Sequence, residues 1–214
     1  SRILETPSIA IGQAIKEVTR MAQIAENNLV AACKAFRNKD EDLVQEVFKQ
    51  EKIINKLETG IVEYLVQLSK EPLTDEQHTQ INVLINVVND IERVGDHSEN
   101  IVELANEAIV SNLPFSDVAL EEFDNIANKS IEVFKKASEA FKETDFDMAR
   151  NVIILEEEID NLEQVYRNNH IDRLNNQTCN PYSGVIFLDL LSNLERVSDH
   201  SSNIALYVLD KLKK

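Results

Sequence analysis

Apolar residues recur at intervals of three and four positions along nearly the whole chain of 214 residues. This spacing is the period of an α-helix, because residues i, i+3, i+4 and i+7 lie on one helical face. Polar and turn-forming residues interrupt the pattern at five places. We therefore predict an all-α protein with six long helices, over residues 7–37, 40–70, 75–111, 116–143, 145–173 and 181–212.

Several interruptions carry the residues that begin helices. Thr6-Pro7 places a proline at the first turn of the first helix, where its missing N–H costs nothing. Thr74 and Gln77 have the spacing of a capping box. Asn180-Pro181 combines a capping side chain with a proline at the start of the last helix. These signals support the predicted helix starts.

The six predicted helices form two sets of three with related sequences. At an offset of 105 residues, Ala35-Phe36 aligns with Ala140-Phe141. Further along, the offset is 103, and Glu92–Ile101 aligns with Glu195–Ile204 with eight of ten positions identical. Chance is a poor explanation for a match of this length. We predict two tandem, pseudo-equivalent three-helix bundles, over residues 7–112 and 113–214.

Acidic residues lie on or beside the apolar stripe of the third helix in each set. Each residue turns about 100° from the one before, so Glu92 falls about 40° and Asp96 about 80° from Val88 at the stripe's centre. In the later set, Glu195 and Asp199 take the same positions. These carboxylates are therefore predicted to lie where the helix packs against a neighbour.

The second helix of each set repeats this arrangement. With Val152 at the centre of the stripe, Glu156 falls at about 40° and Asp160 at about 80°. The earlier set has Glu51 and Asn55 at these places, so one acid is replaced by an amide. Four helices thus carry Glu-x-x-x-Asp, or a near version of it, beside their packing faces.

Carboxylates on a packing face need a compensating partner, because burial of an unpaired charge is unfavourable. Ion pairing is one explanation, but Arg93 points about 100° away from Glu92, and we expect it to serve a neighbouring helix or solvent. A bound cation is another, since oxygen ligands suit Mg²⁺, Ca²⁺ or Mn²⁺ and also carboxylate-bridged iron or zinc. The residue pattern leaves both explanations open.

His97 and His200 are less suitable as ligands than the acids. His97 lies about 140° from Glu92 around the helix, so we expect a polar contact to a neighbouring helix or subunit. The glycines are isolated and form no phosphate loop. No nucleophile–base pair is evident from the spacing, so we expect no enzyme.

The overall composition argues against several classes of partner and fold. With 22 Lys and Arg against 38 Asp and Glu, the net charge of −16 disfavours nucleic acid and anionic lipid surfaces as partners. Only 4 Gly and 4 Pro argue against an all-β fold, which needs many tight turns. Cys33 and Cys179 are too few for a disulfide framework, which favours a reducing compartment. No leader peptide or spanning run of about 20 apolar residues is visible.

The doubled motif Glu-Arg-x-x-Asp-His-x-x-Asn-Ile, at residues 92–101 and 195–204, resembles the PhoU family. The resemblance implies two three-helix bundles that bind multinuclear iron or zinc clusters through Glu/Asp-x-x-x-Asp motifs and restrain phosphate uptake. Because Asn55 replaces an acid, we expect the later site to hold metal more tightly. The metal ligands that the resemblance implies are Glu92, Asp96, Glu195, Asp199, Glu156, Asp160 and Glu51.

The opening Ile3–Ala10 resembles the stretch that joins a transporter domain to a PhoU-like tail in bacterial Na⁺/phosphate cotransporters. The chain also begins with Ser-Arg rather than Met. We therefore expect a metal-binding regulatory tail of a sodium-dependent phosphate transporter, at the cytoplasmic face of the membrane. A freestanding PhoU-type regulator of the phosphate ABC transporter is the alternative, ahead of a carboxylate-metal hydrolase or a helical adaptor. The expected partner is the transporter domain or complex, or a second copy of the chain.

Overall fold

The computed structural model describes residues 6–211, and the six predicted helices are all present there. Their observed ends differ from the predicted ones by no more than two residues. Within the described residues there is no strand, so the all-α class is confirmed. The helices are α1 (Pro7–Asn38), α2 (Glu41–Leu68), α3 (Asp75–Val110), α4 (Asp117–Glu143), α5 (Phe146–Asn175) and α6 (Pro181–Lys211).

The helix starts follow the capping signals of the sequence. At α3 the backbone N–H of Gln77 donates to Thr74 Oγ1, and the Thr74 N–H donates to Gln77 Oε1, which confirms the capping box. At α6 the Asn180 Oδ1 accepts from the backbone N–H groups of Tyr182 and Ser183. These bonds satisfy donors that the first helical turn leaves free.

The two repeats turn from their first helix to their second in the same way. Lys39 and Thr144 both adopt a left-handed conformation with φ of 53°, which ends α1 and α4. Asp40 and Asp145 follow directly, and at the start of the next helix Asp40 accepts from one backbone N–H and Asp145 from two. The internal repeat seen in the sequence therefore extends to the local backbone.

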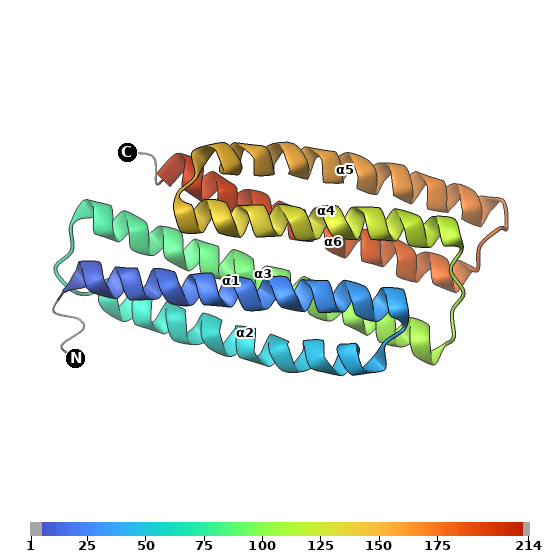
Figure 1. Cartoon of the computed structure of the whole chain (residues 1–214), viewed down its shortest axis with the longest axis horizontal. Coiled ribbons are helices and arrows are strands. Elements are labelled where there is room, and N and C mark those ends of the chain that lie inside the picture. Colours follow the sequence, from blue (N-terminus) through green and yellow to red (C-terminus); the bar gives the residue numbers. More distant parts are fainter. Residues whose placement is uncertain (1–5, 212–214) are drawn as a thin grey trace.

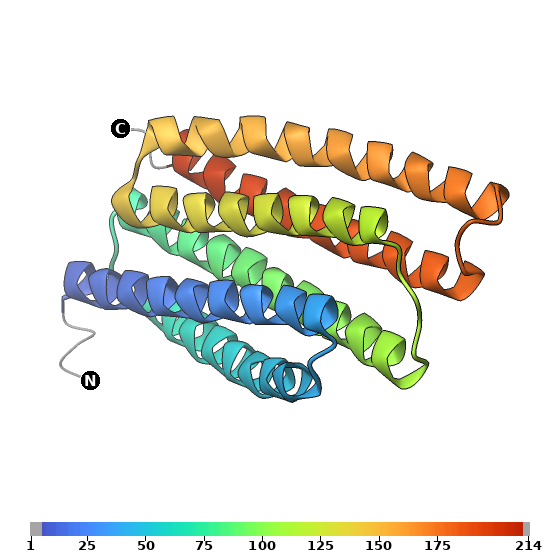
Figure 2. The same ribbon diagram turned by 45° about the vertical axis from the view of Figure 1, so that its right-hand side comes forward.

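The six helices run roughly along the long axis of the molecule, with α2 and α5 on opposite outer sides (Figures 1 and 2). The first and third helices of the repeats meet across the centre, where α3 packs against α6 and α1 against α4. Large side chains such as Phe123, Phe134 and Phe187 are fully buried in the core. Among the described residues each outer helix packs mainly within its own repeat, which creates an α2–α3 seam and an α5–α6 seam.

The segment Ile3–Ala10 is only partly described. Residues 3–5 lie outside the described part of the chain, and Pro7–Ala10 forms the first turn of α1. Among the helices of residues 6–211, none combines the length and apolar character that crossing a membrane requires.

Candidate metal centres

Two groups of carboxylates occupy the two seams. Acid cluster 1 lies in the α2–α3 seam, and acid cluster 2 lies in the α5–α6 seam. The seven residues predicted from the sequence all belong to these clusters. Cluster 1 consists of Glu51, Glu92, Asp96 and Glu99, and cluster 2 of Glu156, Asp160, Glu195 and Asp199.

Glu51 is the most buried member of cluster 1. The residue is 1% exposed, and neither of its carboxylate oxygens has a hydrogen-bond partner. Burial, followed by repulsion from the nearby Asp96, Glu99 and Glu92, raises the pKa of Glu51 to about 8. A buried acid without a partner needs either a proton or a cation.

Gly95 provides the space that the Glu51 carboxylate occupies. A Cβ atom at this position would lie 2.6 Å from Glu51 Oε2, which is closer than real contacts allow, and 3.0 Å from Oε1. The corresponding residue of the second repeat is Ser198, which is fully buried and donates from Oγ to the Glu195 carbonyl. There, Glu156 is only half-buried. The two clusters are therefore related but packed differently.

Cluster 2 brings three carboxylates into close range. One oxygen each from Glu156, Asp160 and Asp199 lies within 4.8 Å of the other two. The Asp160 Oδ1 is buried without a hydrogen-bond partner. Burial, followed by repulsion from the adjacent carboxylates, raises the pKa of Glu156 and of Asp160. The same two causes raise the pKa of Glu195 to about 7. Such mutual repulsion favours a bound positive charge.

The arginines of the repeated motifs contact acids of their own helix. Arg93 Nη1 lies 2.9 Å from Asp96 Oδ2, and Arg196 Nη1 lies 3.9 Å from Asp199 Oδ2. Arg93 is largely exposed to solvent, as expected, but it also pairs with Asp96 of its own helix, which the sequence did not predict. The helical wheel gives only the direction of Cβ, whereas a long side chain reaches residues three positions away. Because both arginine side chains are largely exposed, these pairs offset only a small part of the repulsion.

The unpartnered oxygens test whether a metal fits these seams. Glu51 and Asp160 present buried acceptors with no donor, and their neighbours are further carboxylates. An all-oxygen set of this kind suits hard cations and carboxylate-bridged iron or zinc. The residues therefore fit the cation that the family resemblance implies.

The two motif histidines link the repeats to each other. His97 Nδ1 lies 2.8 Å from Asn193 Oδ1 on α6, and His200 Nδ1 lies 2.9 Å from Asp90 Oδ1 on α3. This confirms the expected contact to a neighbouring helix. We call this set the α3–α6 brace, and the same two acceptors also bond the side-chain amides of Asn100 and Asn203.

Sequence reasoning missed the acceptors of the brace and the role of Gly95. Asp90 and Asn193 are related by the same offset of 103 residues as the histidines, so the repeat contained a signal for them. The repeat contained no signal for the role of Gly95, because the close approach of the Glu51 carboxylate to Gly95 depends on the packing of α2 against α3.

Comparisons with known proteins agree with this architecture. The sequence matches the PhoU domain twice, over residues 18–105 and 123–208. It is 24% identical over 190 residues to a "Phosphate-specific transport system accessory protein PhoU homolog" of Clostridium acetobutylicum, covering 88% of this chain and 85% of that protein. It is 25% identical over 210 residues to "Putative inorganic phosphate export protein YjbB" of Escherichia coli K12, covering 97% of this chain but 38% of that protein.

The fold is shared with a solved PhoU structure. The crystal structure of PhoU from Pseudomonas aeruginosa superposes with a TM-score of 0.91, covering 97% of this chain and 99% of that one, at 20% identity. The structural likeness establishes the fold, and the two sequence matches together span most of the chain. The chain belongs to the PhoU family.

Proposed function

We propose that the chain is a PhoU-type regulator of phosphate transport whose two acid clusters hold metal ions. The regulatory role is supported by the relatives named as accessory proteins of phosphate-specific transport, which align along most of their own length. The proposed partner is a phosphate transporter complex, and the proposed place of action is the cytoplasmic face of the membrane.

The metal part of the proposal depends on one observation, the buried carboxylate oxygens that have no donor. Bound metal would supply positive charge that neutralises facing carboxylates, so that each outer helix is held against the third helix of its repeat. Without it, the carboxylates repel one another across both seams. The proposed holders are Glu51, Glu92 and Asp96 in cluster 1 and Glu156, Asp160, Glu195 and Asp199 in cluster 2.

The α3–α6 brace offers a connection between the two clusters. His97 follows Asp96 directly in the sequence, and His200 follows Asp199. Each histidine is bonded to the third helix of the opposite repeat. A shift of α3 in one seam would therefore displace α6, and a shift of α6 would displace α3. Such coupling suits a regulator whose two repeats change conformation together.

A second candidate is a regulatory domain within a longer phosphate-transport protein. It is favoured by the match to YjbB of E. coli, where 97% of this chain aligns with 38% of that protein. The gene sequence upstream of Ser1 distinguishes the two candidates, since several membrane spans there would support the second. The relatives named above are accessory and export proteins, and we propose no catalytic role for the carboxylates.

Phosphate accumulation in a bacterial strain that lacks its own PhoU-family protein tests the proposed function. We expect the wild-type chain to reduce the accumulation of labelled inorganic phosphate, and the Asp160→Asn/Asp199→Asn variant to lose most of this effect. The matched control is Asp172→Asn/Asp189→Asn, which alters exposed acids on the same two helices. If the wild-type chain behaves like the empty vector at equal expression, the regulatory proposal fails.

A further inference from the structure

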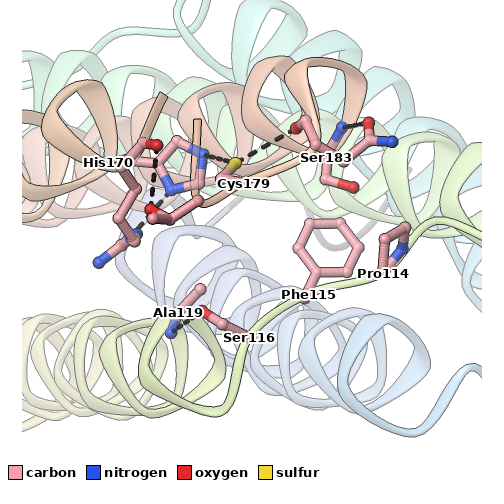
Figure 3. A pocket seen from close by; sticks show the side chains of 10 residues that line it. Pro114, Phe115, Ser116, Ala119, His170, Cys179 and Ser183 are labelled. Carbon is pink, nitrogen blue, oxygen red and sulfur yellow. Dashed lines mark hydrogen bonds between the residues drawn. The ribbon is translucent and has the colours of Figure 1, made fainter. Parts of the chain in front are cut away.

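A separate cavity lies at the far end of the second repeat, where the linker between the repeats meets the α5–α6 loop. Its volume is about 230 Å³, and Figure 3 shows the side chains around it. Ser116 and Asn180 lie at its exposed rim, and His170 and Ser183 are buried in its wall. His170 follows Asp160 by ten residues on α5, or about 15 Å of helix, so the cavity is distinct from cluster 2.

Two residues that line this cavity each carry a buried hydrogen-bond donor without a partner. Ser183 is 2% exposed and its Oγ makes no hydrogen bond, and Arg173 Nε is also buried and unbonded. Among the residues that the structure describes, the other buried side-chain atoms without partners are acceptors, on Asn28, Glu51 and Asp160. The unpartnered acceptors of the seams point to a cation. The two unpartnered donors here point instead to a ligand that accepts hydrogen bonds.

The rest of Arg173 is held firmly in place. Its Nη2 lies 2.6 Å from Glu122 Oε2 and 3.0 Å from His170 Nδ1. Since a guanidinium can only donate, His170 Nδ1 is an acceptor, and the ring proton must sit on Nε2, which faces Cys179 Sγ at 3.4 Å. Burial and then the Arg173 charge lower the pKa of His170 to about 4, so the ring stays neutral.

This arrangement excludes two other uses of the cavity. His170 Nε2 carries a proton, so it cannot take one from the Cys179 thiol as the base of a catalytic pair does. For the same reason it has no lone pair to offer a metal ion beside the thiolate. What remains available to a ligand is the Arg173 Nε–H and the Ser183 hydroxyl.

The electrostatic setting of the cavity suits a small anion. No Asp or Glu lines it, because Glu122 lies behind Arg173. The caps of α4 and α6, Ser116 and Asn180, both line it, so the positive ends of two long helices lie close to the cavity. The volume leaves room for a small anion with ordered water, since one water takes about 30 Å³.

We infer that this cavity binds a small oxyanion, a carboxylate or a phosphate, through Ser183 Oγ and Arg173 Nε. The site belongs to the second repeat alone. Ser183 corresponds to Gln80 at the offset of 103 residues that relates the third helices. Arg173 corresponds to Leu68 at the offset of 105 residues that relates the second helices, so the first repeat lacks the same donors. One oxyanion should therefore bind per chain, in contrast to the duplicated acid clusters.

Binding is tested on metal-free protein, so that the acid clusters cannot contribute. Inorganic phosphate and acetate are titrated by calorimetry, with chloride at equal ionic strength as the control. Alkylation of Cys179 by iodoacetamide reports the location, because Cys33 is buried and burial raises the pKa of its thiol to about 12. We expect one site per chain and a several-fold slower alkylation of Cys179 in the presence of the ligand. Binding of phosphate alone would identify a phosphate site, and equal binding of acetate a general carboxylate site.

Two variants test the named donors. Ser183→Ala should weaken binding about tenfold or more, as expected for the loss of a hydrogen bond to a charged ligand. Arg173→Lys keeps the charge but lacks Nε–H, and should weaken binding similarly. The matched control, Ser138→Ala, removes a hydroxyl that only bonds the Phe134 carbonyl, and should bind like the wild type. Equal protection of Cys179 by chloride, no binding, or unchanged binding by Ser183→Ala would each overturn the inference.

Discussion

The substitution Glu51→Gln should stabilise the metal-free protein at neutral pH. Glu51 is buried, has no hydrogen-bond partner and faces the other carboxylates of cluster 1. Its pKa is raised from 4.5 to about 8 by burial and then by Asp96, Glu99 and Glu92. The folded protein therefore holds a proton that the unfolded chain has already released at pH 7. Glutamine has nearly the same shape and never needs that proton.

The magnitude follows from the linkage between protonation and folding. Between pH 4.5 and 8 the folded state binds one more proton at Glu51 than the unfolded state, so stability falls as the pH rises. The slope is about 1.4 kcal/mol per pH unit, which gives a destabilisation of about 3 kcal/mol at pH 7. Below pH 4.5 both states are protonated and the effect disappears. Glu51→Gln should remove it, raising the melting temperature by about 6–12 °C at pH 7.

Chemical denaturation of chelator-treated protein at pH 4.5, 6, 7 and 8 measures this effect. The difference between wild type and Glu51→Gln should be small at pH 4.5 and grow up to pH 8. Glu63→Gln, which changes an exposed glutamate of the same helix, is the matched control and should follow the wild type. A constant difference across the range, or a destabilised variant at pH 8, would refute the assignment of a buried, protonated Glu51.

Two further substitutions test the packing around the clusters. Gly95→Ala should displace the Glu51 carboxylate, because a Cβ at this position would lie 2.6 Å from Oε2, and the pKa of Glu51 measured by NMR should fall toward its ordinary value. The control Gly60→Ala lies at an exposed position on α2 with open space around it, so it should leave the pKa of Glu51 unchanged and stabilise the folded protein by roughly 0.5–1 kcal/mol. Equal effects of the two substitutions on the pKa of Glu51 would contradict the role of Gly95. Asp90→Ala should cost about 1–3 kcal/mol in the free energy of unfolding, because His200 and Asn203 lose their acceptor. Asp90→Asn keeps an acceptor oxygen and should lower the free energy of unfolding by less. An unchanged free energy of unfolding in both variants would show that the α3–α6 brace does not stabilise the fold.

The helices and their repetition could be predicted from the sequence because they depend on local periodicity. The apolar stripe places residues on a face through the helical rotation alone, and Glu92, Asp96, Glu156 and Asp160 accordingly lie in the predicted seams. The capping signals at Thr74 and Asn180 act over three residues and were equally readable.

The remaining features depend on contacts between distant parts of the chain. The Arg93–Asp96 pair was not predicted, because a wheel carries no information on side-chain length. The space at Gly95 exists only once α2 lies against α3. The cavity combines Ser116 with Arg173 and Ser183, which no repeat or motif connects in the sequence.

Metal analysis of the purified, tag-free protein tests the central claim most directly. The account predicts bound iron or zinc in the wild-type protein and a lower melting temperature in chelator. Asp160→Asn/Asp199→Asn should lose the metal of cluster 2, whereas the control Asp172→Asn/Asp189→Asn should retain it. The account is contradicted if the wild-type protein carries metal only at background level and melts at the same temperature with and without chelator.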